Sequence, residues 1–320
     1  SLEPISTPFG ELASGQAQRL TDRRVFGATC RDETLWLLVE GPALMEVNSP
    51  TMPAPLPLQE ATDVATSLGT NLIVVGRADG GPWQLHRVEG VDEGGAELRL
   101  ETLSGLRSNP LDGRKANFGR FTDELPLYAG HEDGNLYVLT ATELFRLQRG
   151  DSELGQQTPI DILWDQFPLG DPEQHPSAFA AEPWDGDAPA VLFALGGSLY
   201  RYVVGRGLVA RLVGAGNTPA QPGSLALTAL PETIHALQVD AEGRIWLRWD
   251  GYVGYINDQG QLIAIAGGGQ HSPRQAQHPW ELELATSSPV HPSLAVGPQG
   301  VIRVAEPNAG VVLSFLTRAR

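Results

Sequence analysis

The sequence predicts an all-β protein: a single six-bladed β-propeller of four-stranded antiparallel blades, with its ring closed by the N-terminal strand. Three observations favour this fold. Short segments alternate apolar and polar residues with a period of two, as half-buried strands do. Clusters of Gly, Asp and Asn separate these segments and provide tight turns. The resulting group of four strands recurs along the 320 residues of the chain.

The clearest group covers residues 236–269. Its strands are expected at 236–240, 244–249, 252–256 and 261–266. Gly243 and Gly260 end two of the turns, where a positive φ is needed, and Asp250-Gly251 is typical of a two-residue hairpin. Because one such sheet cannot bury both of its faces alone, similar sheets must pack against it.

The other groups define the domain organisation. Blades are expected within one domain, residues 1–320, at 25–58, 61–103, 125–164, 178–213, 236–266 and 293–316. The last group has only three strands, so the stretch 4–10 is expected to complete it, with residues 5–9 paired to 311–316. The proline-rich segment 50–57 makes the fourth strand of the first blade short, peripheral or absent. Five or seven blades remain open if a weak group is misjudged.

Composition excludes several classes of function. A net charge of -16 argues against binding nucleic acid or an anionic membrane through a general electrostatic footprint. The charge suits a cationic partner, although it also serves solubility alone. Cys30 is the only cysteine, which leaves no internal disulfide and no cysteine-built zinc site. No apolar run reaches the roughly 18 residues of a membrane span.

One part of the chain resembles a known family. The segment VDAEGRIWLRWDGYVGYINDQGQLIAIAGGG, and more weakly LAVGPQGVIRVAEPNAGVVLSF and LYRYVVGRGLVARLVGAG, resemble the NHL-repeat family of β-propellers. The resemblance covers residues 190–316, and the first half of the chain shares only the spacing of strands and turns. Gly297 stands where the repeat usually has Asp, and Glu306 stands where it usually has an Asp-Thr or Asp-Asn pair.

Three histidines form a candidate metal site. In a propeller, the residues before each innermost strand and after each second strand line one mouth of the central channel. His175, His235 and His291 each precede an expected innermost strand of consecutive blades. Three imidazoles can hold a divalent ion such as Zn with an open position, and some NHL-like lyases use histidines from separate blades in this way. His175 and His291 are each followed by Pro-Ser, whereas His235 sits nearer its strand, so coincidence is the alternative explanation.

A second set of residues follows the expected second strands and forms a candidate ligand-binding rim: Glu40, Arg77, Asp79, Trp249, Asp250 and Glu306. Such an acidic rim with an aromatic side chain suits a cationic or sugar-like ligand, or Ca²⁺. The alternative is a set of solvated turn residues, with Asp250 making an Asx turn. His86 alternates with Leu85 on an expected strand and is predicted at the surface.

These observations favour a non-catalytic recognition or sensor module, without a cofactor, that binds a protein, peptide or glycan on one face. The alternatives are a metal-dependent lyase or hydrolase using the three histidines, and a structural spacer. The resemblance to sensor ends of membrane kinases implies an extracytoplasmic or cell-surface location, with the cytoplasm left open. Lys115 is the only lysine, a bias typical of GC-rich bacterial genomes. The start without Met suits a mature form or a domain excised from a larger protein.

Overall fold

The computed structural model of the chain contains two compact units, Phe26–Asp165 and Ser1–Val25 with Gln166–Arg320. We call them the middle unit and the terminal unit. The structure describes residues 12–18, 23, 25–31, 34–47, 52–67, 71–78, 84–91, 98–102, 127–130, 136–139, 144–147, 157–160, 176–182, 188–240, 242–272, 278–284, 294–297, 301–306 and 311–317.

The middle unit carries three four-stranded sheets, each made of strands that follow one another in the chain. The first sheet contains β2 (Val25–Arg31), β3 (Thr34–Val39), β4 (Ala43–Glu46) and β5 (Ala54–Pro55). The second contains β6 (Glu60–Ser67), β7 (Asn71–Arg77), β8 (Gln84–Glu89) and β9 (Arg99–Thr102). The third contains β10 (Leu127–Gly130), β11 (Leu136–Leu139), β12 (Leu144–Leu147) and β13 (Gln157–Ile160).

Two details of the middle unit follow from proline and from pairing. Strand β5 has only two residues, because prolines around it cannot donate to the ladder. Strand β13 uses the rather polar stretch Gln157–Ile160, and Ile160 is opposite Leu144. The third blade was expected to extend to residue 164, and residues 161–164 lie outside the described residues.

The terminal unit contains two further sheets of consecutive strands. One is formed by β14 (Pro176–Ala181), β15 (Ala190–Leu195), β16 (Ser198–Val203) and β17 (Leu208–Val213). The other is formed by β20 (Ile234–Val239), β21 (Ile245–Trp249), β22 (Tyr252–Ile256) and β23 (Leu262–Gly267). The first strands of neighbouring sheets, β14 and β20, lie close together. In the stretch of chain that connects β17 to β20, β18 (Thr218–Pro219) and β19 (Ala229–Leu230) form a short parallel pair.

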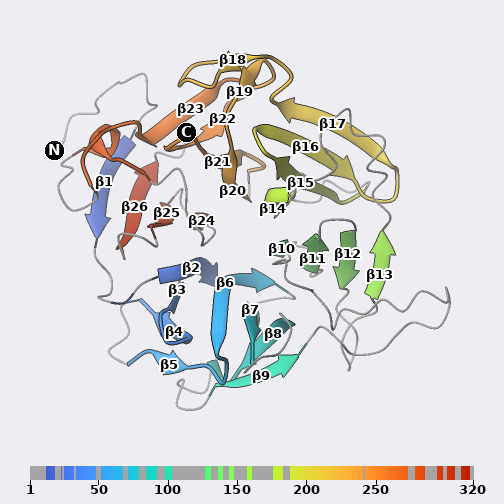
Figure 1. Cartoon of the computed structure of the whole chain (residues 1–320), viewed down its shortest axis with the longest axis vertical. Helices are drawn as coiled ribbons and strands as arrows, with labels where there is room; N and C mark the ends of the chain where they lie inside the picture. Colours follow the sequence, from blue (N-terminus) through green and yellow to red (C-terminus); the bar gives the residue numbers. More distant parts are fainter. Residues whose placement is uncertain are drawn as a thin grey trace. The chain divides into compact units, whose positions relative to one another are not determined.

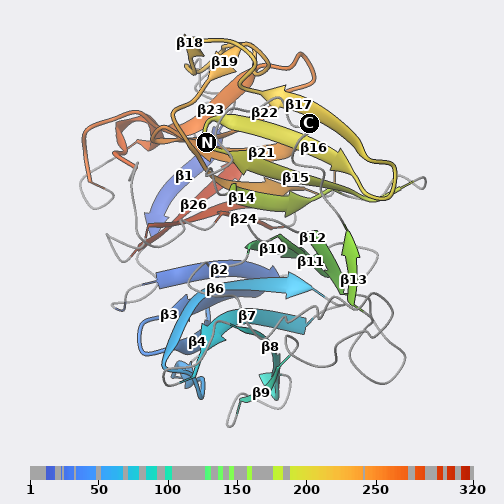
Figure 2. The same ribbon diagram turned by 45° about the vertical axis from the view of Figure 1, so that its right-hand side comes forward.

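The last sheet joins both ends of the chain. Strands β24 (Leu294–Val296), β25 (Val301–Glu306) and β26 (Val311–Thr317) pair in order, and β1 (Leu12–Gln18) pairs antiparallel with β26. Figures 1 and 2 show β26 between β1 and β25. The strand that completes this sheet is therefore Leu12–Gln18, and the predicted partner at 5–9 lies outside the described residues. The prediction followed apolar residues, whereas an edge strand needs only its backbone groups.

The described cores of the terminal unit lie between neighbouring sheets. Successive side chains of a strand point to opposite faces, so β21 supplies both cores. Trp246 packs with residues of the β24–β26 sheet such as Ile302 and Phe315. Trp249, on the other face, packs with residues of the β14–β17 sheet such as Leu192 and Leu199. Both indoles are fully buried, so inter-sheet packing holds the sheets of this unit together.

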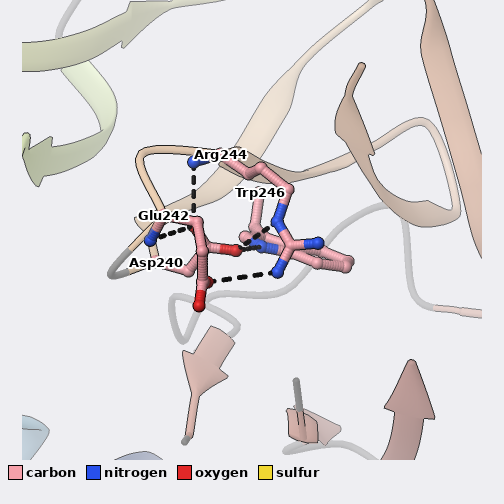
Figure 3. Close-up of polar contacts among 4 residues, drawn as sticks. All are labelled: Asp240, Glu242, Arg244 and Trp246. Carbon is pink, nitrogen blue, oxygen red and sulfur yellow. Dashed lines mark hydrogen bonds and ion pairs between the residues drawn. The ribbon is translucent and has the colours of Figure 1, made fainter. Parts of the chain in front are cut away.

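A buried carboxylate shapes the turn between β20 and β21 (Figure 3). Asp240 Oδ1 accepts hydrogen bonds from the backbone N–H groups of Glu242 at 3.1 Å and Arg244 at 2.8 Å. Its Oδ2 accepts from Arg244 Nε at 2.7 Å and from Trp246 Nε1 at 2.8 Å. One side chain therefore fixes the turn backbone, a cation and a core tryptophan together.

His86 on β8 differs from its predicted surface position. Its side chain is buried, and Nδ1 lies 3.3 Å from the hydroxyl of Thr102. Burial lowers the pKa of His86, and a backbone hydrogen bond with Gly76 offsets part of that effect. Leu85, whose side chain points to the opposite face, is also buried, so both faces of β8 are covered here, which the alternation of a single strand does not reveal.

Candidate functional site

The candidate site lies at one edge of the terminal unit, where β20 begins and where β21 and β25 end. In the β20–β21 pair, Ile234 is opposite Trp249, and the register shifts around His235. In the β24–β25 pair, Leu294 is opposite Val304, two residues before Glu306. The same edge therefore carries the residues before an inner strand and those that end a second strand, as the sequence predicts.

An ion pair joins two sheets at this edge. Arg248 on β21 lies on the same face as Trp246, toward the β24–β26 sheet, and its Nη2 is 2.6 Å from Glu306 Oε1. The side chains are 0% and 3% exposed. Burial lowers the pKa of Arg248, and the neighbouring Glu306 carboxylate opposes this. The pair thus places two opposite charges out of water, where each depends on the other.

Asp250 has a structural role in the next turn. Asp250 and Gly251 both have positive φ, 40° and 82°, as a two-residue hairpin requires. The Asp250 carboxylate accepts hydrogen bonds from the backbone N–H of Glu232, at 2.9 and 3.1 Å, and of Thr233, at 3.2 Å. The carboxylate therefore fastens the connector before β20 to the end of β21.

A hydroxyl ties the neighbouring sheet to the same edge. Ser177 on β14 donates a hydrogen bond from Oγ to the carbonyl oxygen of Ile234 at 2.7 Å. This bond joins the beginnings of two inner strands. Together with Asp250 and the Arg248–Glu306 pair, it fixes the backbone around His235.

Of the three predicted metal ligands, the structure describes His235. It lies half-buried at the irregularity near the start of β20. His175 and His291 lie outside the described residues. Among the residues that are described, no three His, Cys, Asp or Glu side chains come together in a way that could hold a metal ion. The three-histidine site stays a prediction.

The predicted rim residues have different surroundings. Glu40 and Arg77 belong to the middle unit, whereas Trp249, Asp250 and Glu306 belong to the terminal unit. Asp79 lies outside the described residues.

Glu40 is exposed at the end of β3. Arg77 makes two hydrogen bonds to Glu60 across the β6–β7 ladder, at 2.9 and 3.0 Å. The structure brings together the residues of the terminal unit, and there Trp249 is a core residue and Glu306 is buried.

Two contributors to this edge were missed from the sequence, Arg248 and Ser177. Arg248 had a detectable signal, because a charged residue at an inward position of an apolar strand requires a partner. Ser177 had none, since its bond goes to a backbone oxygen of another sheet. Chemically, the described edge offers exposed Glu232 and half-buried Thr233 and His235 on a backbone that internal polar bonds hold in place.

Comparisons with solved structures identify the fold. A protein of unknown function from Bacteroides thetaiotaomicron aligns with a TM-score of 0.63 and 14% identity, over 97% of this chain and 75% of that one. An auxiliary nutrient binding protein from the same species aligns with a TM-score of 0.59 and 9% identity, over 98% and 74%. A catalytically inactive variant of virginiamycin B lyase from Staphylococcus aureus aligns with a TM-score of 0.54 and 14% identity, over 95% and 98%.

The structures that align with the chain are β-propeller proteins, and the chain has the all-β propeller fold with four-stranded antiparallel blades. Five of these sheets consist of four consecutive strands, and β24–β26 gain their fourth strand from β1. No family model and no curated protein matches the sequence. Within the described residues, no helix has the length and apolar character needed to cross a membrane.

Proposed function

We propose that the chain is a non-catalytic recognition or sensor module that binds a protein, peptide or glycan at the edge where β20 begins. In this proposal the sheets form one domain, an NHL-like ring of six blades closed by the pairing of β1 with β26. The module acts outside the cytoplasm of a bacterium, its negative charge keeps it from nucleic acid and anionic membranes, and it needs no cofactor.

The proposal rests on one observation: the charged groups at this edge are paired with each other or with the backbone. Arg248 and Glu306 neutralise each other, and the Asp250 carboxylate accepts hydrogen bonds from two backbone N–H groups. These groups hold the edge rigid, and a preorganised surface loses less entropy on binding than a mobile one. The aligned auxiliary nutrient binding protein gives a precedent for binding on this fold, although fold alone does not determine function.

A charge reversal at the exposed edge tests this proposal. The protein is screened against a panel of immobilised glycans and a displayed library of linear peptides, and the hits are titrated by calorimetry. We expect Glu232→Lys to weaken the strongest hit by about tenfold or more, which corresponds to about 1.4 kcal/mol. The reason is that Glu232 is exposed beside the Asp250 contact and faces any ligand bound there.

Glu242→Lys is the matched control. Glu242 is also exposed and lies in the turn at the opposite end of β20, so the same change in net charge is made away from the edge. Equal affinity in both variants and in the unaltered protein would exclude the edge as the binding surface. Equal weakening in both would show that only the net charge of the chain matters.

A metal-dependent lyase or hydrolase is the second candidate. The position of His235 favours it, because this half-buried imidazole lies at the start of an inner strand. With His175 and His291 it would supply three nitrogen ligands for a divalent ion. The two candidates make opposite predictions about bound metal.

A further inference from the structure

The connector between β17 and β20 is unusual in its charge. The chain contains 22 basic and 38 acidic residues, yet none lies between Arg211 and Glu232. This connector includes β18 and β19, and both views place these strands beside β23 (Figures 1 and 2). We call residues 223–230 the leucine segment.

In the leucine segment the small apolar side chains are buried and the large ones are exposed. Ala226 and Ala229 are buried, at 2% and 1% exposure. Leu225, Leu227 and Leu230 are exposed to 54%, 50% and 41%. Each buried methylene group contributes about 0.8 kcal/mol, so stability alone would place the leucines inward and the alanines outward. Exposed apolar residues that gather in one segment make it a candidate interaction surface.

Backbone bonds on both sides hold the leucine segment in place. The N–H of Ala226 donates to the carbonyl of Gly260 at 2.8 Å, and the carbonyl of Leu227 accepts from Ala215 at 2.8 Å. On the β23 side, the carbonyl of Ser224 also accepts from Leu262 at 2.9 Å. The segment therefore lies between the end of β17 and the start of β23, and it displays its leucines from a fixed backbone.

The size and charge of the surface indicate what it binds. Three half-exposed leucines present an apolar area on the order of a few hundred Å², whereas a stable interface of standard size buries about 800 Å² on each partner. A second copy of the chain therefore fits poorly, all the more because each copy has a charge of -16. Exposed Glu232 follows the segment, and exposed Asp258 lies in the turn that ends at Gly260.

We propose that the leucine segment docks the apolar face of a short, basic amphipathic helix from a partner protein. Two or three aliphatic side chains of such a helix cover the leucines, and its Lys or Arg residues lie near Glu232 and Asp258. Recognition is by side chains, because backbone groups of Ala215, Gly260 and Leu262 already pair with the segment on both sides. Glu232 is shared with the site proposed at the start of β20, whereas the three leucines are not, so the leucine variants test this docking separately from the edge ligand.

The test uses the full chain and a fluorescent helical peptide of about five turns with leucine on one face and lysine on the other. A second peptide has serine in place of the leucines and keeps the lysines. We expect the leucine peptide to bind the protein, and the triple variant Leu225→Ser, Leu227→Ser and Leu230→Ser to bind it about tenfold or more weakly. Leu227→Ser alone should show part of the loss if the triple variant unfolds.

Leu208→Ser is the matched control, because Leu208 on β17 is 58% exposed and lies outside the leucine segment. It should retain the affinity of the unaltered protein. Equal binding of both peptides, or of the triple variant and the control, would overturn the proposal, since charge attraction would then explain it. Self-association in sedimentation that the triple variant abolishes would also overturn it and identify a second copy as the occupant.

Discussion

Glu306→Gln is expected to lower the free energy of unfolding by about 3–5 kcal/mol. The variant keeps the shape of the side chain and removes its charge, which leaves Arg248 buried without its carboxylate. A guanidinium cannot lose its proton to escape this situation, so the unfolded state becomes more favourable. Chemical denaturation followed by tryptophan fluorescence measures the loss, because Trp246 and Trp249 lie on the same strand as Arg248.

Two further variants test whether the loss of stability comes from breaking a buried pair or from any change of charge. The double variant Arg248→Met and Glu306→Leu removes both charges and should recover most of the lost stability. Glu60→Gln breaks the pair with Arg77, whose side chains are 36% and 46% exposed, and should cost less than about 1 kcal/mol. Equal losses for Glu306→Gln and Glu60→Gln would contradict the assignment of Arg248–Glu306 as a buried link between sheets.

Asp240→Ala is expected to destabilise the protein by about 3 kcal/mol. The change removes four hydrogen bonds and leaves the N–H of Trp246 buried without its acceptor (Figure 3). Arg244 also loses its ion pair with a carboxylate whose side chain is only 4% exposed. Thermal or urea unfolding of the purified variant measures the effect.

Asn257→Ala provides the comparison for this turn. Asn257 Oδ1 accepts from the backbone N–H of Gln259 at 3.1 Å and Gln261 at 2.8 Å, so it shapes the turn between β22 and β23 in a similar way. It binds no core tryptophan and carries no charge, and its loss should cost about 1 kcal/mol. A loss as large as that of Asp240→Ala would show that turn geometry, rather than the charged network, dominates.

The strands could be predicted well where alternation and turn residues agree. In the terminal unit, β22 has the predicted bounds, and β21 and β23 each begin one residue later than predicted. The pairing partner of β26 could not be predicted, because LASGQAQ has no apolar alternation and an edge strand is specified by its backbone. The short pair of β18 and β19 was also missed, since two-residue strands leave no period in the sequence.

The strand topology predicted which residues of the terminal unit share this edge, but not the contacts that they make. The end of a second strand lies at the same edge as the start of an inner strand. This rule selected Trp249, Asp250 and Glu306. It could not show that Trp249 packs in a core or that Glu306 is buried against Arg248, because these contacts involve different sheets. Asp250 has the turn geometry that its Asp-Gly sequence predicts.

The most direct test of the proposed function is elemental analysis of the purified protein, with thermal unfolding before and after chelation. A recognition module held together by its own ion pairs predicts no stoichiometric transition metal and no change of Tm on chelation. One equivalent of metal, lost in His235→Ala, would contradict this proposal and support the metal-dependent enzyme.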